Sequence, residues 1–206
     1  MKYVIEHMEE GFSEWVILEY AQIIRDVGRD NLILTSLPAH ITEKDIPQQL
    51  RDLGLQWTTD ECVTLNGGLA KDRVCLLDPA AEQDLAPADS QNFDYFVFGG
   101  ILGSHPRVDR TGILRGKYNF AGRRLGELQM TTDTAIRTTQ IIIERQTDFK
   151  DIAFIDYPEI KFNKYESTEM PFRYVLDAEG RPVLPQGMLV LIKHDAEQSI
   201  DDLLME

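Results

Sequence analysis

Several features that mark common protein classes are missing from this 206-residue chain. Its two cysteines, Cys62 and Cys75, are too few for a disulfide framework and indicate a reducing, intracellular location. No apolar stretch approaches the roughly 20 residues that cross a bilayer. The segment Met1–Glu6 reaches an acidic residue too soon for a signal peptide. We therefore expect a cytoplasmic protein without a membrane partner.

Motifs for metal, nucleophilic and phosphate chemistry are also missing. The chain has no H-E-x-x-H and no G-x-S-x-G sequence, and no Gly-Lys-Ser/Thr follows its glycine runs. The histidines are few, and their spacing fits no zinc site; they are His7, His40, His105 and His194. We expect no metal site, so any chemistry must come from an organic cofactor and carboxylates.

Positive charge is scarce. The chain has 21 Lys and Arg against 35 Asp and Glu, for a formal net charge of −14. Nucleic-acid binding depends largely on cations that neutralise phosphates, so we expect no stable nucleic-acid complex. An acidic surface favours a basic protein partner, although it can also serve solubility alone. One modest basic cluster keeps an RNA substrate open as an alternative; it comprises Arg107, Arg110, Arg115, Lys117, Arg123 and Arg124.

Apolar strands and amphipathic helices alternate through most of the chain, which predicts an α/β fold with a mostly parallel sheet and helices on both faces. Ser13 can cap a helix that ends at Gly28, and Pro47 suits the first turn of a helix starting near Asp45. The expected strands are 4–5, 32–34, 74–77, 93–98, 121–125 and 152–156, and the expected helices are 13–27, 45–54, 111–118 and 131–143.

The pattern changes after about residue 157. Turn residues at 177–180 predict a hairpin between 172–176 and 182–184, followed by short amphipathic segments at 189–193 and 200–204. We therefore divide the chain into a core at 1–158 and an extension at 159–206 that packs on the core. The acidic end of this extension is expected to help dock a basic substrate.

Glycine-rich loops follow the predicted strands. Gly99 and Gly100 end the strand at 93–98, and Gly126 opens a turn before the last long helix. In parallel α/β sheets small ligands bind at the carboxyl ends of strands, and glycine lets backbone amides approach them. A plain structural turn explains either loop alone. Together they predict a cofactor cleft built largely from main chain.

Three segments, Leu76–Pro79, Gly99–Pro106 with Asp109 and Arg110, and Arg124–Thr132, resemble the cofactor loops of SPOUT methyltransferases. The resemblance implies a parallel α/β sheet with a C-terminal trefoil knot that binds S-adenosylmethionine in a bent form. The knot rests on the resemblance alone. The implied cofactor contacts are Leu77, Pro79, Gly99, Gly100, Ile101, Leu102, Gly103, Leu125, Gly126, Leu128, Met130 and Thr131.

Longer blocks at 6–20, 98–103, 129–140 and 169–176 resemble the fungal SPOUT protein-arginine methyltransferases. That resemblance implies a monomer that methylates one arginine of a basic small-subunit ribosomal protein, the third in standard naming. Two departures from the sequence patterns of RNA-modifying relatives weaken the case for an RNA substrate. Ribose-methylating relatives place a phosphate-binding arginine in a loop that here reads Glu9–Trp15, and tRNA guanine enzymes have Gly-Gly where this chain has Thr132-Asp133.

Methyl transfer to arginine requires control of a strongly basic group. A sulfonium methyl is already activated, whereas the guanidinium pKa lies above about 12 and a carboxylate must orient it and accept its proton. We expect acidic residues at strand ends to do this. Glu9 and Glu14 are the first candidates, unless they are only solvated helix-terminus charges. The further candidates are Asp78, Asp156 and Glu159.

Two other functions remain open at this point. The first is an RNA methyltransferase acting on rRNA or tRNA, which the basic cluster alone supports. The second is a non-catalytic acidic escort of a basic ribosomal protein that keeps an unused cofactor pocket. Detection of a methyl group on the partner protein separates all three possibilities.

Overall fold

The computed structural model describes residues 1–100, 109, 111–164 and 166–195. Its centre is a six-stranded sheet in which every pairing is parallel. In sheet order the strands are β3 (Gln56–Trp57), β2 (Leu32–Thr35), β1 (Lys2–His7), β5 (Tyr95–Gly100), β4 (Val74–Leu77) and β6 (Ala121–Arg123). This confirms the predicted parallel α/β fold.

The central strands are apolar because both faces of the sheet are covered. β1 pairs with β5 from Lys2 opposite Tyr95 to His7 opposite Gly100, and four residues of β4 in a row are buried. Parallel sheets need this continuous apolar pattern, since helices pack against each side. The register places the carboxyl ends of β1, β4 and β5 along one edge.

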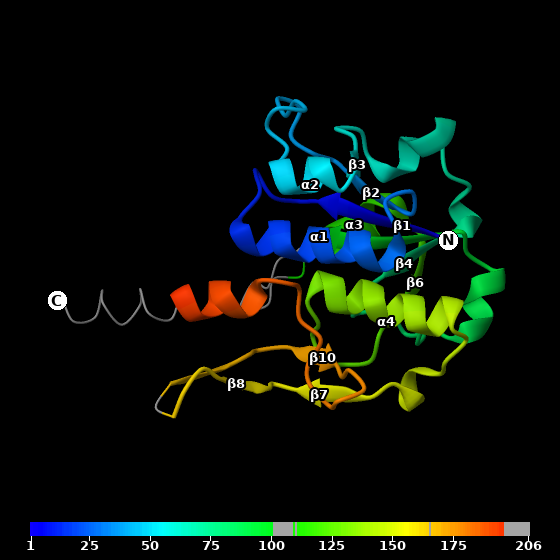
Figure 1. Cartoon of the computed structure of the whole chain (residues 1–206). Helices are drawn as coiled ribbons and strands as arrows, with labels where there is room; N and C mark the ends of the chain where they lie inside the picture. The colour runs from blue at the N-terminus through cyan, green and yellow to red at the C-terminus, as the bar shows by residue number, and fades with distance from the viewer. Residues whose placement is uncertain (101–108, 110, 165, 196–206) are drawn as a thin grey trace.

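Helices cover both faces of the sheet (Figure 1). On one face α1 (Glu14–Val27) lies beside α4 (Thr132–Glu144), and on the other lies α3 (Thr111–Tyr118). The α1 boundaries confirm the sequence prediction: the Ser13 hydroxyl accepts from the Val16 amide at 3.3 Å, and Gly28 ends the helix at φ +84°.

Some elements differ from the sequence prediction. The helix expected from Asp45 begins later, as α2 (Gln48–Asp52), because Pro47 takes an extended conformation at its N-cap. The region 58–72, in which no helix or strand was predicted, holds two short 3-10 helices at Cys62–Gly67 and Lys71–Arg73. The strand β7 (Phe154–Asp156) does not join the parallel sheet.

Instead, β7 pairs antiparallel with β10 (Arg173–Val175) and so belongs with the C-terminal extension. A second antiparallel pair, β8 (Glu159–Lys161) with β9 (Ser167–Glu169), was not predicted. The predicted turn after β10 is confirmed, since the Asp177 amide donates to the Arg181 carbonyl and the Val183 amide to the Val175 carbonyl. The boundary at 158 therefore divides a small sheet.

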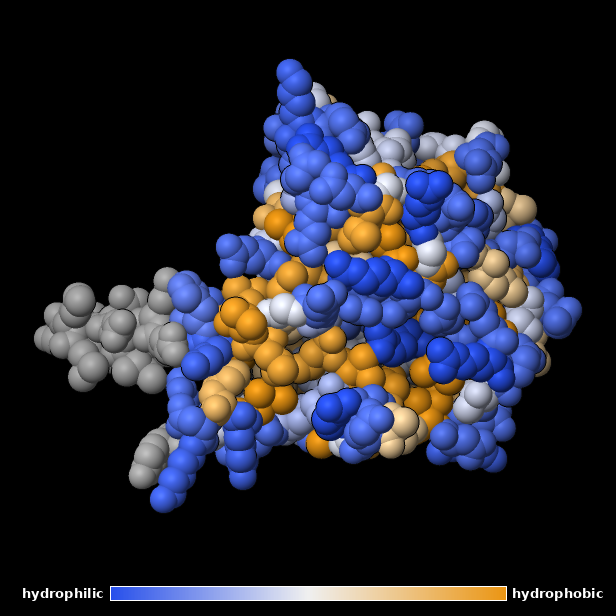
Figure 2. All heavy atoms as spheres, in the orientation of Figure 1, coloured by the Kyte–Doolittle hydropathy of each residue, from blue (hydrophilic) through white to orange (hydrophobic). Residues whose placement is uncertain are grey.

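The extension packs on the core through its own apolar cluster. Phe172, Tyr174, Met188 and other buried side chains contact the outer face of α1 at Trp15 and Leu18. A helical segment at 188–195 lies at this contact, and Figure 2 shows apolar atoms gathered around it. The segment expected at 200–204 lies outside the described residues. No helix in the described ranges has the length and apolarity to cross a membrane.

Candidate active site

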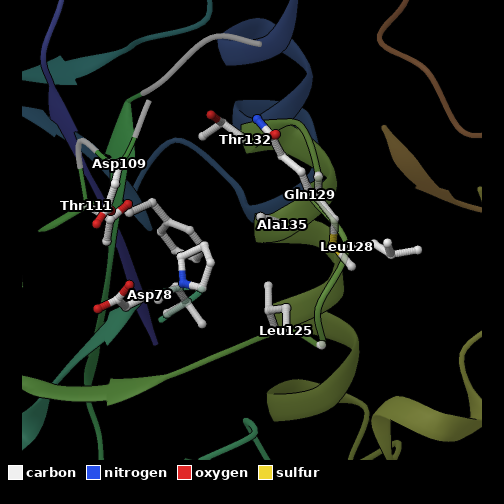
Figure 3. A pocket seen from close by; sticks show the side chains of 14 residues that line it. Asp78, Asp109, Thr111, Leu125, Leu128, Gln129, Thr132 and Ala135 are labelled. Carbon is white, nitrogen blue, oxygen red and sulfur yellow. The ribbon is translucent and has the colours of Figure 1, made fainter. Parts of the chain in front are cut away.

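A cavity opens at the carboxyl ends of β4 and β5, against the loop that precedes α4. In Figure 3 Asp78, Asp109 and Thr111 lie on one side of the cavity, and Leu125, Leu128, Ala135, Gln129 and Thr132 lie on the other. The lining residues are Leu77, Asp78, Pro79, Phe98, Gly99, Asp109, Thr111, Leu125, Gly126, Leu128, Gln129, Met130, Thr132 and Ala135.

Backbone geometry makes glycine necessary at the turn beside this cavity. Gly126 has φ +72°, a left-handed conformation that L side chains rarely adopt. A Cβ placed on it would lie 2.8 Å from the ring of Phe149, which packs behind the loop. The tight turn brings main-chain groups to the cavity wall, as the sequence predicted for a cofactor loop.

The structure brings seven of the predicted cofactor contacts together in one wall: Leu77, Pro79, Gly99, Leu125, Gly126, Leu128 and Met130. Gly100 and Thr131 do not line the cavity. A Cβ on Gly100 would meet the Glu6 carbonyl oxygen at 2.8 Å, so that glycine serves close strand packing. Thr131 is buried, and its hydroxyl donates to Thr134. Ile101, Leu102 and Gly103 lie outside the described residues.

Several lining residues were missed because they carry no glycine or proline signal. Phe98, Gln129, Thr132 and Ala135 stand beside predicted contacts on the same segments. Their position next to the glycine loops was the available signal. Sequence alone could not say which neighbour turns inward, since that depends on how the loop before α4 meets the strand ends.

Asp78 lies in the cavity wall, but it already has a cation. Its side chain is 3% exposed, and both its oxygens accept from the guanidinium of Arg115, one of them at 3.0 Å. The Ala80 amide also donates to Asp78 Oδ1 at 2.9 Å. The carboxylate holds the pKa of Arg115 above its usual range. Asp78 is thus anchored in an ion pair, and proton acceptance there would break it.

The other four predicted carboxylates do not line the cavity. Glu9 is half-buried and Glu14 is exposed at the start of α1. Asp156 accepts two hydrogen bonds from Arg173, at 2.6 and 2.9 Å, which lower the pKa of its carboxyl. Glu159 accepts from the Ser167 hydroxyl at 2.6 Å, which likewise lowers its pKa. The structure does not gather the five candidates into one site.

A different pair of carboxylates is buried between the helices. Glu19 on α1 is 0% exposed, and Asp133 on the first turn of α4 is 2% exposed. The Trp15 indole N–H donates to Glu19 Oε1 at 2.8 Å. Within the described part of the chain, Glu19 Oε2, Asp133 Oδ1 and the Tyr174 hydroxyl have no hydrogen-bond partner.

Burial and like charge govern the ionisation of this pair. Burial is the main cause that raises the pKa of Glu19, and the neighbouring Asp133 raises it further. Burial also raises the pKa of Asp133 to about 6, although a hydrogen bond from Thr131 opposes the shift. The sequence carried one signal of this site. Glu19 falls on the same helical face as Val16 and Ile23, where an apolar residue is expected.

The basic cluster that suggested RNA binding is largely engaged with carboxylates. Among the described residues, Arg115 pairs with Asp78, Arg123 with Asp89 at 3.0 Å, and Arg124 with Asp84 at 2.6 Å. Lys117 contacts Glu61 at 2.5 Å. Arg107 and Arg110 lie outside the described ranges. These cations hold the structure together and are less available to phosphates.

Comparison with solved structures defines the class. The full-length spTrm10 complex with S-adenosylhomocysteine superimposes with a TM-score of 0.54 at 11% identity, covering 72% of this chain and 90% of that one. At this identity the likeness concerns the fold alone. The parallel α/β sheet is the fold that the two chains share, whereas the knot stays a prediction.

The family follows from closer relatives. The Saccharomyces cerevisiae protein arginine N-methyltransferase SFM1 is 65% identical over 213 residues, which cover all of both chains. The crystal structure of the yeast arginine methyltransferase SFM1 with S-adenosylmethionine has a TM-score of 0.91 at 63% identity, covering 94% of this chain and 90% of that one. The family described as protein arginine N-methyltransferase SFM1-like matches residues 2–199. The chain therefore belongs to the SFM1-like family of protein arginine N-methyltransferases.

Proposed function

We propose that this chain transfers a methyl group from S-adenosylmethionine to one arginine of a small-subunit ribosomal protein, the third in standard naming. The observation that carries the proposal is the 65% identity, over the full length of both chains, to a yeast protein arginine N-methyltransferase. The ribosomal substrate and a monomeric state rest on the sequence resemblance, whereas a cytoplasmic location rests on the low cysteine content. The net charge of −14 suits a basic protein substrate.

The cavity at the strand ends would hold the cofactor. Its apolar side chains, among them Leu77, Leu125 and Leu128, can flank the adenine ring. Backbone amides of the Gly126 turn can satisfy the ring nitrogens without a side chain in the way. A yeast relative at 63% identity has been crystallised with S-adenosylmethionine, which supports the same cofactor in this chain.

Mass spectrometry of small ribosomal subunits tests the activity. Unmethylated subunits are incubated with the chain and S-adenosylmethionine, and we expect one protein to gain a methyl group on one arginine. Methyl groups on ribosomal RNA and none on protein would instead support the RNA methyltransferase. A stable complex with a ribosomal protein that gains no methyl group would support the escort.

Calorimetry with S-adenosylmethionine tests the position of the cofactor. We expect Gly126→Arg to weaken binding at least about 100-fold, because the new side chain must enter either the cavity or the space of Phe149. The matched control is Gly180→Arg, a positive-φ glycine in the extension with open space around its Cβ. Unchanged affinity in the Gly126 variant would place the cofactor elsewhere.

A further inference from the structure

Two carboxylates and a phenol from three separate elements are buried. Among the described residues, Glu19 Oε2, Asp133 Oδ1 and Tyr174 Oη have no hydrogen-bond partner. Their exposed fractions are 0%, 2% and 1%. Burying an unpaired carboxylate costs several kcal/mol, and two adjacent ones also repel each other. Folded chains keep such a group mainly where it has a function.

The three groups lie on elements that pack against one another. Burial raises the pKa of both Glu19 and Tyr174, and the charge of the neighbouring Asp133 raises both further. α1 and α4 pack side by side, and α4 also contacts β10, which carries Tyr174. The site therefore lies where the core helices meet the extension.

The neighbouring cation is already engaged. Arg137, one turn along α4 from Asp133, donates to Asp26 of α1 and forms an ion pair with it. Its charge influences Asp133 from a distance, but its hydrogen bond goes to another carboxylate. Glu19 Oε2, Asp133 Oδ1 and the Tyr174 hydroxyl have no hydrogen-bond partner among the described residues, so they keep acceptor capacity that a cation with several N–H groups would satisfy.

A guanidinium matches this set in charge and shape. It is planar and permanently positive, and it carries five N–H donors that two carboxylates can grip along two edges. A metal ion fits less well, because the described residues contain no group of three or more His, Cys, Asp or Glu placed to bind one. The acceptor of this family's reaction is itself a guanidinium.

The site adjoins the cavity. Asp133 directly follows Thr132, which lines the cavity, and Ala135 of the same helical turn lines it too (Figure 3). The first turn of α4 thus presents residues to the cavity on one side and Asp133 toward α1 on the other. On the outer side stands Trp15, which is half-buried and donates to Glu19.

We propose that Glu19, Asp133 and the Tyr174 hydroxyl bind the guanidinium of the substrate arginine, and that Asp133 accepts its proton during methyl transfer. This inference rests on the proposed function. A guanidinium nitrogen forms a bond to the methyl carbon while the methyl–sulfur bond breaks. The electron pair goes to sulfur, giving S-adenosylhomocysteine, and the N–H proton passes to the Asp133 carboxylate.

Isosteric substitutions separate this role from a structural one. We expect Asp133→Asn to lower turnover on small ribosomal subunits at least about 100-fold, the usual contribution of a general base, and Glu19→Gln mainly to raise KM. Affinity for S-adenosylmethionine should stay within about twofold of wild type. Melting temperatures should stay equal or rise, because each change removes a buried charge. The control is Glu144→Gln on the same helix, where the Tyr3 hydroxyl donates at 2.7 Å.

The proposal and the proposed function fail in different ways. If wild type methylates its substrate and Asp133→Asn does so as fast as Glu144→Gln, the function stands and this site is wrong. If wild type methylates nothing, the function fails, and the site is judged by binding alone. A crystal soaked with methylguanidine and S-adenosylhomocysteine should then show the guanidinium between Glu19 and Asp133. Methylguanidine bound elsewhere, or absent, would overturn the site.

Discussion

Asp78 and the Glu19–Asp133 pair are buried carboxylates near the same cavity, yet their surroundings differ. Asp78 has the guanidinium of Arg115 and a backbone amide. Glu19 and Asp133 have each other, and one oxygen of each has no partner in the described structure. A compensated charge stabilises a loop, whereas an uncompensated pair costs stability and is suited to a cationic ligand. The comparison distinguishes a carboxylate whose charge is neutralised by a cation from a pair that has none.

Removal of the counterion at Asp78 should give the largest loss of stability. Arg115→Gln leaves a 3%-exposed carboxylate without its cation, and we expect the free energy of unfolding to fall by about 1–3 kcal/mol. The estimate stays low because Arg115 itself is 44% exposed. Urea unfolding measures the change.

The control for Arg115 lies on the same helix. Lys117 pairs with Glu61, but both side chains are more than 40% exposed, so Lys117→Gln should change stability by less than about 1 kcal/mol. Equal losses in the two variants would mean that burial of Asp78 does not matter. The contrast between the two carboxylate sites would then disappear.

The second prediction concerns pH. The pKa values of Glu19 and Asp133 are raised in the folded state, so folding favours their protonated forms. The stability that comes from this protonation is fully present below the unfolded-state pKa of about 4, and it is lost as pH rises through the raised pKa values of the folded state. Each proton changes the free energy of unfolding by up to about 1.4 kcal/mol per pH unit. We therefore expect the free energy of unfolding of Glu19→Gln, measured relative to wild type, to be higher at pH 8 than at pH 5.

Urea unfolding of both proteins at the two pH values gives the measurement, and the difference between them cancels other titrating groups. His7 is one of these, because burial lowers the pKa of its ring and its protonation at low pH opposes folding. Carboxyls in ion pairs, such as Asp156, have lowered pKa values, so the stability that they contribute is lost only at lower pH. A variant that shows no pH-dependent gain would argue against a charged buried pair.

The smallest effect is expected at the phenol. The Tyr174 hydroxyl has no partner in the described structure, so Tyr174→Phe should change stability by less than about 0.5 kcal/mol. Tyr3→Phe is the matched comparison, because the Tyr3 hydroxyl donates to Glu144 at 2.7 Å and its loss should cost about 1 kcal/mol. A larger loss at Tyr174 than at Tyr3 would show that this hydroxyl has a structural partner.

Local signals predicted much of the fold. The cap at Ser13, the glycine at the end of α1 and the continuous apolar run at Val74–Leu77 all correspond to observed boundaries. The loops proposed to hold the cofactor were selected by glycine and proline at strand ends, and seven of their residues line the described cavity. The strands β3, β8 and β9 were missed because two or three residues carry no measurable period. β7 was assigned to the wrong sheet because the sequence of an apolar strand does not show which strand it pairs with.

The five carboxylates proposed for catalysis stay a prediction, and the structure places them apart for a physical reason. The sequence selected carboxylates by their place at strand and helix ends, but Asp78, Asp156 and Glu159 proved to be bound by neighbouring groups. Glu19 and Asp133 lie in the middle of α1 and at the start of α4, far apart in the chain. Only the packing of the two helices shows that they are neighbours.

The sequence by itself determined the class of fold, the glycine-bearing loops at the strand ends and the acidic composition of the chain. Backbone propensity, apolar period and composition are properties of short segments or of the whole chain, so they can be read without coordinates. Only the tertiary structure decided which charges neutralise one another. Ionisation depends on distance and burial, and both arise when α1, α4 and the C-terminal extension come together.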